Sequence, residues 1–155
     1  MKIIAGGLDD SRVQELLTYH FTSARAETAC GSTHALDLSG LKSPDINFWS
    51  AWDGEVVIGI GALKRLSESH GELKSMHTAQ SHRRKGIGSA MVRHIIGEAR
   101  KMGLSRLSLE TGSRPYFAPA RELYSRHGFI ECSPFGNYAA DPNSVFMTLE
   151  LSSGS

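Results

Sequence analysis

The chain has 155 residues, of which 40% are hydrophobic and 21% are charged, and its formal net charge is +1. These values are ordinary for a single globular domain, and a nearly neutral chain is not expected to bind nucleic acid through its overall charge. No apolar run approaches the roughly 20 residues that a membrane-spanning helix needs, and the N-terminal stretch is too short for a signal peptide. We therefore expect a cytoplasmic protein without nucleic-acid or membrane partners, with one domain over residues 1–151 and a frayed tail over 152–155.

The chain carries two cysteines, Cys30 and Cys132. They form no Cys-x-x-Cys pair, and the seven histidines form no His-Glu-x-x-His or similar motif. The sequence thus predicts two free, reduced thiols and no metal site.

The first half of the chain predicts a strand over residues 1–4 and a helix from about residue 12 to 25, because apolar residues recur there at helical spacing. Residues 26–44 show no clean period, so we expect an irregular segment that borders a functional site and holds a short helix. The clearest hairpin joins strands over 47–52 and 55–66 through Asp53-Gly54. Gly59 and Gly61 lie inside its second strand and indicate a bend or bulge.

The second half predicts a strand over 72–79, a helix from about 88 to 102, a strand over 104–110, a helix over 118–127, and strands over 129–132 and 145–151. Gly103 and Gly128 are expected to end the two helices. Regular alternation along the strand over 72–79 would place four side chains on one face. These are Glu72, Lys74, Met76 and Thr78.

A short basic loop, Arg83-Arg84-Lys85-Gly86-Ile87-Gly88, runs directly into the first of these helices. Two glycines let a ligand approach the backbone, and a helix start offers unpaired N–H groups and positive potential. This pattern suits a phosphate or diphosphate. It satisfies neither the dinucleotide fingerprint nor the P-loop pattern, and a solvated basic turn that caps the helix is the alternative.

Two segments resemble the GNAT superfamily of N-acetyltransferases. Arg83-x-x-Gly86-x-Gly88 is similar to the family's acetyl-CoA signature, and residues 120–129, Ala-Arg-Glu-Leu-Tyr-Ser-Arg-His-Gly-Phe, are similar to its second segment about 35 residues later. The resemblance covers residues 1–151 and points to a bacterial subfamily of poorly defined substrate. It implies an α+β, three-layer fold, in which a mixed, mostly antiparallel sheet with a splayed central strand pair carries helices on both faces.

The resemblance also implies an activity: transfer of an acetyl group from acetyl-CoA to a small-molecule amine by direct attack in a ternary complex. Glu72 matches the family's general base and Tyr124 the residue that protonates the leaving thiolate. Each has an alternative role, because Glu72 can simply pair with Lys74 or be solvated, and Tyr124 can simply pack. The expected cofactor-binding residues are Met76, His77, Thr78, Arg83, Arg84, Lys85, Gly86, Ile87, Gly88, Ser89, Phe117 and Tyr124.

One departure from the family is Phe117, which replaces an asparagine that touches the pantetheine in many members, and we expect its ring to pack on the cofactor instead. The acceptor amine is expected to meet His20, His34, Lys74 and Tyr138, with His34 as the first candidate. Two other functions stay open, acetylation of a protein or peptide and binding of acyl-CoA without catalysis. A homodimer is compatible with the sequence.

Overall fold

The computed structural model describes residues 1–26, 38–79 and 86–151. Their strands form one sheet in the order β1-β2-β3-β4-β5-β7-β6, in which β4 and β5 are parallel and every other neighbouring pair is antiparallel. The strands are β1 (Lys2–Ala5), β2 (Ile46–Asp53), β3 (Val56–Arg65), β4 (His70–Thr78), β5 (Arg106–Gly112), β6 (Ile130–Cys132) and β7 (Ser144–Glu150).

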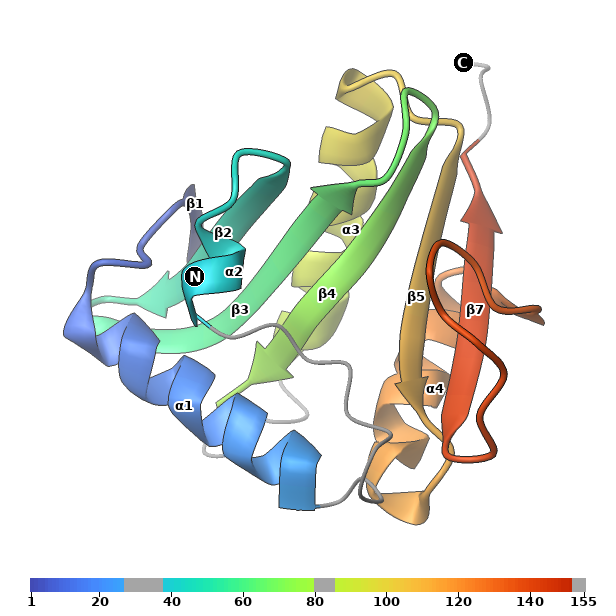
Figure 1. The fold of residues 1–155 in the computed structure, drawn as a ribbon. Coiled ribbons are helices and arrows are strands. Elements are labelled where there is room, and N and C mark those ends of the chain that lie inside the picture. Colours follow the sequence, from blue (N-terminus) through green and yellow to red (C-terminus); the bar gives the residue numbers. More distant parts are fainter. Residues whose placement is uncertain (27–37, 80–85, 152–155) are drawn as a thin grey trace.

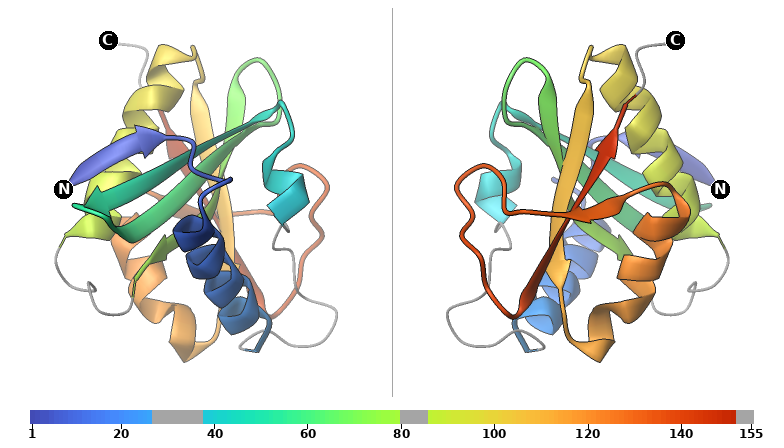
Figure 2. Two further views of the ribbon diagram at one scale, coloured as in Figure 1. Left: turned by 90° about the vertical axis from the view of Figure 1, so that its left-hand side faces the viewer. Right: turned by 90° about the vertical axis from the view of Figure 1, so that its right-hand side faces the viewer.

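Helices cover both faces of this sheet (Figures 1 and 2). The helices α1 (Ser11–Ala26) and α2 (Leu38–Leu41) lie on one face, and α3 (Ile87–Lys101) and α4 (Ala118–Arg126) lie on the other, with a 3-10 turn over Pro115–Phe117 before α4. The predicted three-layer α+β fold with a mixed, mostly antiparallel sheet is confirmed. No helix in the described ranges is long and apolar enough to cross a membrane.

Each layer of helices buries its own core against the sheet. The core below α1 includes Val13, Leu17 and Phe21, three members of the predicted helical stripe. The core below α3 and α4 is larger and includes Met91, Ile95 and Leu107 together with Tyr124. The two cores assign the strand side chains to faces, because a residue packed in one core cannot point toward the other.

The predicted hairpin forms as expected. Asp53 pairs with Val56, and Gly54 between them has a φ of 61°, a conformation that a glycine adopts without steric cost. A bulge lies beside Gly59, where the register between β2 and β3 shifts after Ala51.

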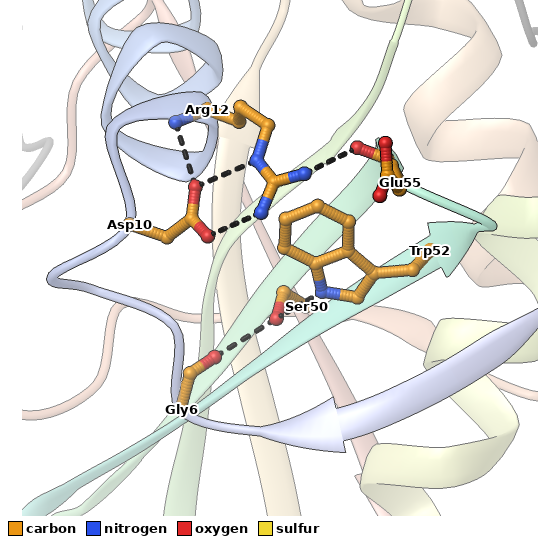
Figure 3. Close-up of polar contacts among 6 residues, drawn as sticks. All are labelled: Gly6, Asp10, Arg12, Ser50, Trp52 and Glu55. Atoms are coloured by element: carbon orange, nitrogen blue, oxygen red, sulfur yellow. Dashed lines mark hydrogen bonds and ion pairs between the residues drawn. The ribbon is translucent and has the colours of Figure 1, made fainter.

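A polar clamp fixes the start of α1 on this hairpin (Figure 3). The Arg12 guanidinium donates to Asp10 Oδ1 and Oδ2 at 3.0 and 2.8 Å and to the Glu55 carbonyl at 2.7 Å, and it lies 4.7 Å from the Trp52 ring centroid. The Trp52 indole N–H donates to Ser50 Oγ at 2.9 Å, and that hydroxyl donates to the Gly6 carbonyl at 2.9 Å. Helix, hairpin and N-terminal loop are therefore tied together at one point.

A second bulge lies in β4 and corrects the predicted alternation. Ile60 pairs with His77 but Ala62 pairs with Lys74, so β4 carries one extra residue, and Ser75 there has a φ of 55°. Beyond the bulge the faces exchange. Glu72 and Lys74 project on the α1 side together with His77, whereas Met76 and Thr78 project on the α3 side. The expectation of one face for Glu72, Lys74, Met76 and Thr78 is wrong, because alternation holds only in a regular strand.

Candidate active site

The two parallel strands diverge soon after they meet. Pairing between β4 and β5 is confined to three positions, from His70 with Arg106 to Glu72 with Ser108. Beyond them β4 pairs only with β3 and β5 only with β7, and Figure 1 shows the two strands spreading apart. We call this region the β4–β5 divergence. It is the predicted splayed strand pair.

Helix α3 begins beside the divergence. Gly86 is its N-cap with a φ of 79° and no side-chain cap, and a Cβ on Gly88 would lie 3.0 Å from Leu123 of α4 and 3.6 Å from Thr78 Oγ1. Gly86 thus allows the left-handed backbone turn before α3, and Gly88 allows α3 to pack closely against α4. The backbone N–H groups of Ile87, Gly88 and Ser89 make no hydrogen bond within the described residues.

The other predicted loop residues divide into two groups. The Ser89 hydroxyl lies 3.0 Å from His127 Nε2, and the Ile87 side chain is buried against Gly59, so both side chains contact the protein itself at the helix start. Arg83, Arg84 and Lys85 lie outside the described residues, as does His34.

On the α1 side of the sheet, three polar side chains of the predicted site meet. Tyr138, from the segment between β6 and β7, donates to Glu72 Oε2 at 2.6 Å, and Lys74 Nζ donates to the same oxygen at 3.0 Å and to the Tyr138 hydroxyl at 3.0 Å. The side chains of Glu72 and Lys74 are only 4% and 10% exposed. Burial and the Glu72 charge raise the pKa of Tyr138, so its hydroxyl stays protonated and donates. Glu72 therefore forms an ion pair with Lys74, and its expected role as general base stays a prediction.

The described residues leave two atoms of this cluster open. Both hydrogen bonds to Glu72 end on Oε2, and Oε1 receives none. A lysine ammonium has three N–H donors, and Lys74 uses two of them. One acceptor, Glu72 Oε1, and one donor, the third N–H of Lys74, are thus left without a partner among the described residues, on two neighbouring side chains that are largely buried.

Two histidines from different elements form a second cluster on this face. His20 Nδ1 of α1 lies 3.1 Å from His77 Nδ1 of β4, and the Tyr19 ring packs against His77 at 5.6 Å between centroids. Burial lowers the pKa of His20 to about 4, so its imidazole is neutral near pH 7. His20 and His77 come together because the β4 bulge turns His77 to the α1 side.

Sequence reasoning missed a chain of buried hydroxyl groups next to Glu72. His70 Nε2 lies 2.7 Å from Ser108 Oγ, which lies 2.9 Å from Thr148 Oγ1. Burial and the Arg106 charge lower the pKa of His70. The chain follows from the register of β4, β5 and β7, which no local pattern in the sequence specifies.

Tyr124 of α4 is buried in the core below α3 and α4, 7% exposed, and burial raises its pKa. Its hydroxyl makes no hydrogen bond within the described residues. The hydroxyl oxygen is not among the fully buried side-chain atoms without a partner, so it is open to a hydrogen bond from outside the described residues.

Phe117, which precedes α4, covers Gly112 at the end of β5, where a Cβ would clash with its ring. Arg121 fixes the same junction by donating to the carbonyls of Gly112 and Arg114 at 2.6 and 3.0 Å. The sequence did not single out Arg121, because its partners are backbone atoms.

The sequence profile described as the Acetyltransferase (GNAT) family matches residues 13–129 of this chain. The chain belongs to the GNAT acetyltransferase family. As a GNAT protein it is similar to two bacterial relatives. It is 50% identical over 151 residues to YsnE of Bacillus subtilis (strain 168), covering 97% of this chain and 100% of the relative, and 47% identical over 139 residues to YedL of Escherichia coli (strain K12), covering 90% and 87%. Both relatives are named uncharacterized N-acetyltransferases.

Solved GNAT structures share the fold. One of them, a Bacillus subtilis acetyltransferase in complex with CoA, superposes with a TM-score of 0.73 at 19% identity and covers 97% of this chain and 99% of its own. In the described part of this GNAT chain, no group of three or more histidine, cysteine, aspartate or glutamate side chains is placed to hold a metal ion.

Proposed function

We propose that this protein transfers an acetyl group from acetyl-CoA to a primary amine of a small molecule by direct attack in a ternary complex. The observation that carries the proposal is the helix start at the β4–β5 divergence, where three backbone N–H groups of α3 have no partner among the described residues. Two relatives named N-acetyltransferases, at 47% and 50% identity, support the same activity.

The start of α3 fits the diphosphate of acetyl-CoA. Its N–H groups, which have no partner among the described residues, and the positive end of the helix dipole attract an anion. In the described part of the chain, no atom lies within 4 Å of where a Cβ of Gly86 would be. Arg83, Arg84 and Lys85 would add charge there. The backbone of Met76, His77 and Thr78 borders the divergence and would hold the pantetheine arm and the acetyl carbonyl. When bound, acetyl-CoA supplies the acetyl group as an activated thioester.

Two side chains then move protons. Glu72 accepts, through its open Oε1 or a water molecule, the proton that the amine nitrogen loses as it bonds to the acetyl carbon. Tyr124 donates its proton to the sulfur as the carbon–sulfur bond breaks and the electron pair leaves with the sulfur. The Tyr124 hydroxyl has no hydrogen-bond partner in the part of the chain that the structure describes, which supports this assignment.

A small acceptor is favoured over a peptide by Tyr138. Its hydrogen bond to Glu72 draws the segment between β6 and β7 over the α1 side of the sheet. We call this side, which carries Glu72, Lys74 and His77, the acceptor face. A peptide acceptor would need an open groove across that face.

The first test combines calorimetric titration with coenzyme A and an assay of free thiol with acetyl-CoA and a panel of amines. We expect binding and amine-dependent thiol release. Absence of coenzyme A binding would overturn the proposal, binding without transfer to any acceptor would indicate a non-catalytic module, and transfer to peptides alone would indicate the peptide alternative.

A matched pair of glycine variants locates the diphosphate. Gly86 and Gly103 lie at opposite ends of α3 with φ values of 79° and 80°, and a Cβ added to either glycine would have no atom within 4 Å. Gly86→Ala and Gly103→Ala therefore impose similar backbone strain, about 1 kcal/mol. Only Gly86→Ala should weaken coenzyme A binding; equal affinities of the two variants would contradict this location.

The base assignment has its own test. Glu72→Gln keeps the shape of the side chain and removes its charge, so turnover should fall about 100-fold or more and lose its dependence on an ionised carboxylate. Unchanged turnover across the pH range would refute the role of Glu72 and leave the activity standing.

A further inference from the structure

The floor of the acceptor face offers one negative and one positive group at contact distance. Glu72 Oε2 and Lys74 Nζ are 3.0 Å apart, and both side chains are at least nine-tenths buried. Oε1 of Glu72 accepts no hydrogen bond, and the third N–H of Lys74 has no acceptor within the described residues. A ligand that fills both positions must present a donor and an acceptor close together.

The surroundings of this pair are aromatic on one side. Phe135, Tyr138 and Phe146 form a cluster of rings with centroids 5.3 to 5.9 Å apart, and the Tyr138 ring lies 5.7 Å from Lys74 Nζ. Their apolar edges and faces suit a flat hydrophobic group.

The other side is formed by α1. Figure 1 shows α1 and the segment between β6 and β7 in front of the same face of the sheet, with β4 between them. Tyr19 and His20 face His77 there, and burial keeps His20 neutral by lowering its pKa to about 4. Two further charged groups belong to this face: Glu110, whose Oε2 accepts from Ser144 at 2.8 Å, and Lys64, which lies opposite Glu72 in the register of β3 and β4.

We propose that the acceptor is an α-amino acid with an aromatic side chain, bound with its amino group at Glu72 Oε1 and its carboxylate at Lys74 Nζ. This inference rests on the proposed acetyl transfer and names its substrate class. An α-amino acid carries its amino and carboxylate groups on one carbon atom, so it presents a donor beside an acceptor and complements both charges. Its aromatic side chain would lie against Phe135 and Tyr138.

The same arrangement accounts for the role of Lys74. A simple amine satisfies Glu72 but leaves the third N–H of the buried ammonium without an acceptor, and an unpaired buried donor is costly. A carboxylate provides a charge-assisted hydrogen bond at that position. Lys74 is thus a specificity residue that contacts the acceptor and takes no part in the proton transfers.

The test on the unmodified protein compares three acceptors: L-phenylalanine, 2-phenylethylamine, which lacks the carboxylate, and L-alanine, which lacks the ring. We expect kcat/KM for L-phenylalanine to exceed that for 2-phenylethylamine by about 10- to 100-fold, the value of one hydrogen bond to a charged group. It should also exceed that for L-alanine by at least about 10-fold, because the ring is buried. Equal kcat/KM for L-phenylalanine and 2-phenylethylamine overturns the carboxylate site, and equal values for L-phenylalanine and L-alanine overturn the aromatic preference.

A variant then assigns the discrimination to one side chain. Lys74→Met removes the charge and keeps an unbranched apolar chain. Loss of the ion pair with Glu72 should affect both acceptors, but the ratio of kcat/KM for L-phenylalanine to kcat/KM for 2-phenylethylamine should fall about 10- to 100-fold, because only L-phenylalanine also loses its carboxylate contact. If Lys74 had a purely structural role, the variant would change kcat/KM for both acceptors by the same factor, and that result would refute the assignment. Lys101→Met, at an exposed lysine of α3, is the control and should change kcat/KM for neither acceptor.

The outcomes separate this inference from the proposed function. If the protein binds coenzyme A and acetylates 2-phenylethylamine as well as L-phenylalanine, the acceptor class is wrong and the acetyltransferase stands. If no amine is acetylated, the proposed function fails with it. Should Lys74→Met not fold, the comparison of the three acceptors on the unmodified protein decides alone.

Discussion

Glu72 and His77 project from the same face of β4 although five positions separate them in the sequence. In a regular strand an odd separation places two side chains on opposite faces. Ser75, the extra residue of the bulge, restores them to one face. The acceptor face therefore combines a carboxylate, an ammonium and an imidazole from a single strand. Met76 and Thr78 of the same strand face α3 on the other side of the sheet.

The bulge should be sensitive to the residue that forms it. Ser75 has a φ of 55°, which costs a side-chain-bearing residue about 1–2 kcal/mol and a β-branched residue more. We expect S75V to lower the free energy of unfolding by about 1–2 kcal/mol and S75G to leave it unchanged or raise it by up to about 1 kcal/mol. Urea denaturation at constant m-value measures both. Equal stability of S75V and the unmodified protein would contradict the left-handed conformation.

The clamp at the start of α1 predicts a pH dependence of stability. Hydrogen bonds from Arg12 lower the pKa of Asp10 from 3.8 to about 2. Because the folded-state pKa is depressed, the contribution of Asp10 is present above pH 4 and is lost as the pH falls from about 4 to 2. Asp10→Asn should therefore lower the urea midpoint at pH 7, and the difference should shrink toward pH 3.

Asp9→Asn is the matched control for this measurement. Asp9 neighbours Asp10, but its side chain is 96% exposed and lies 3.4 Å from Lys42. An exposed ion pair of this kind contributes little, so its removal should leave the urea midpoint nearly unchanged at every pH. If Asp10→Asn lowered the urea midpoint by the same amount at pH 7 and at pH 3, the charge of Asp10 would play no part in the clamp.

The sequence predicted those parts of the molecule that local pattern determines. Helical spacing from Val13 to Phe21 specified α1 within a residue or two at each end, and Asp53-Gly54 specified the hairpin turn. The family resemblance added the splayed strand pair, which the three-residue pairing of β4 with β5 bears out.

What the sequence did not predict depends on contacts between distant segments. The bulge at Ser75 arises from pairing with β3, so the faces of Met76 and Thr78 were assigned wrongly. Likewise, Gly88 is needed next to Leu123 of α4, 35 positions away, and the clamp of Arg12 on Trp52 joins a helix to a hairpin. None of these partners is visible in a local window of residues.

The buried imidazole of His20 predicts a loss of stability in mild acid. Burial lowers its pKa from 6.5 to about 4, so between these values the unfolded chain binds a proton that the folded chain does not. The free energy of unfolding should fall as the pH drops through this range, by up to roughly 3 kcal/mol at pH 4. His20→Gln should reduce this slope in urea titrations at pH 7, 6, 5 and 4. An unaltered slope would mean that His20 titrates normally.

The Tyr124 hydroxyl allows stability and catalysis to be separated in one variant. Since it makes no hydrogen bond within the described residues, Tyr124→Phe removes no interaction of the folded chain and should leave the free energy of unfolding within about 0.5 kcal/mol of its original value. If the hydroxyl protonates the leaving sulfur, however, the rate of acetyl transfer in a single turnover should fall about 100-fold. Tyr116→Phe, at a tyrosine that is 39% exposed, should change neither quantity. A Tyr124→Phe variant that transfers acetyl groups at the original rate would reduce Tyr124 to a packing residue of α4 and require another proton donor for the thiolate.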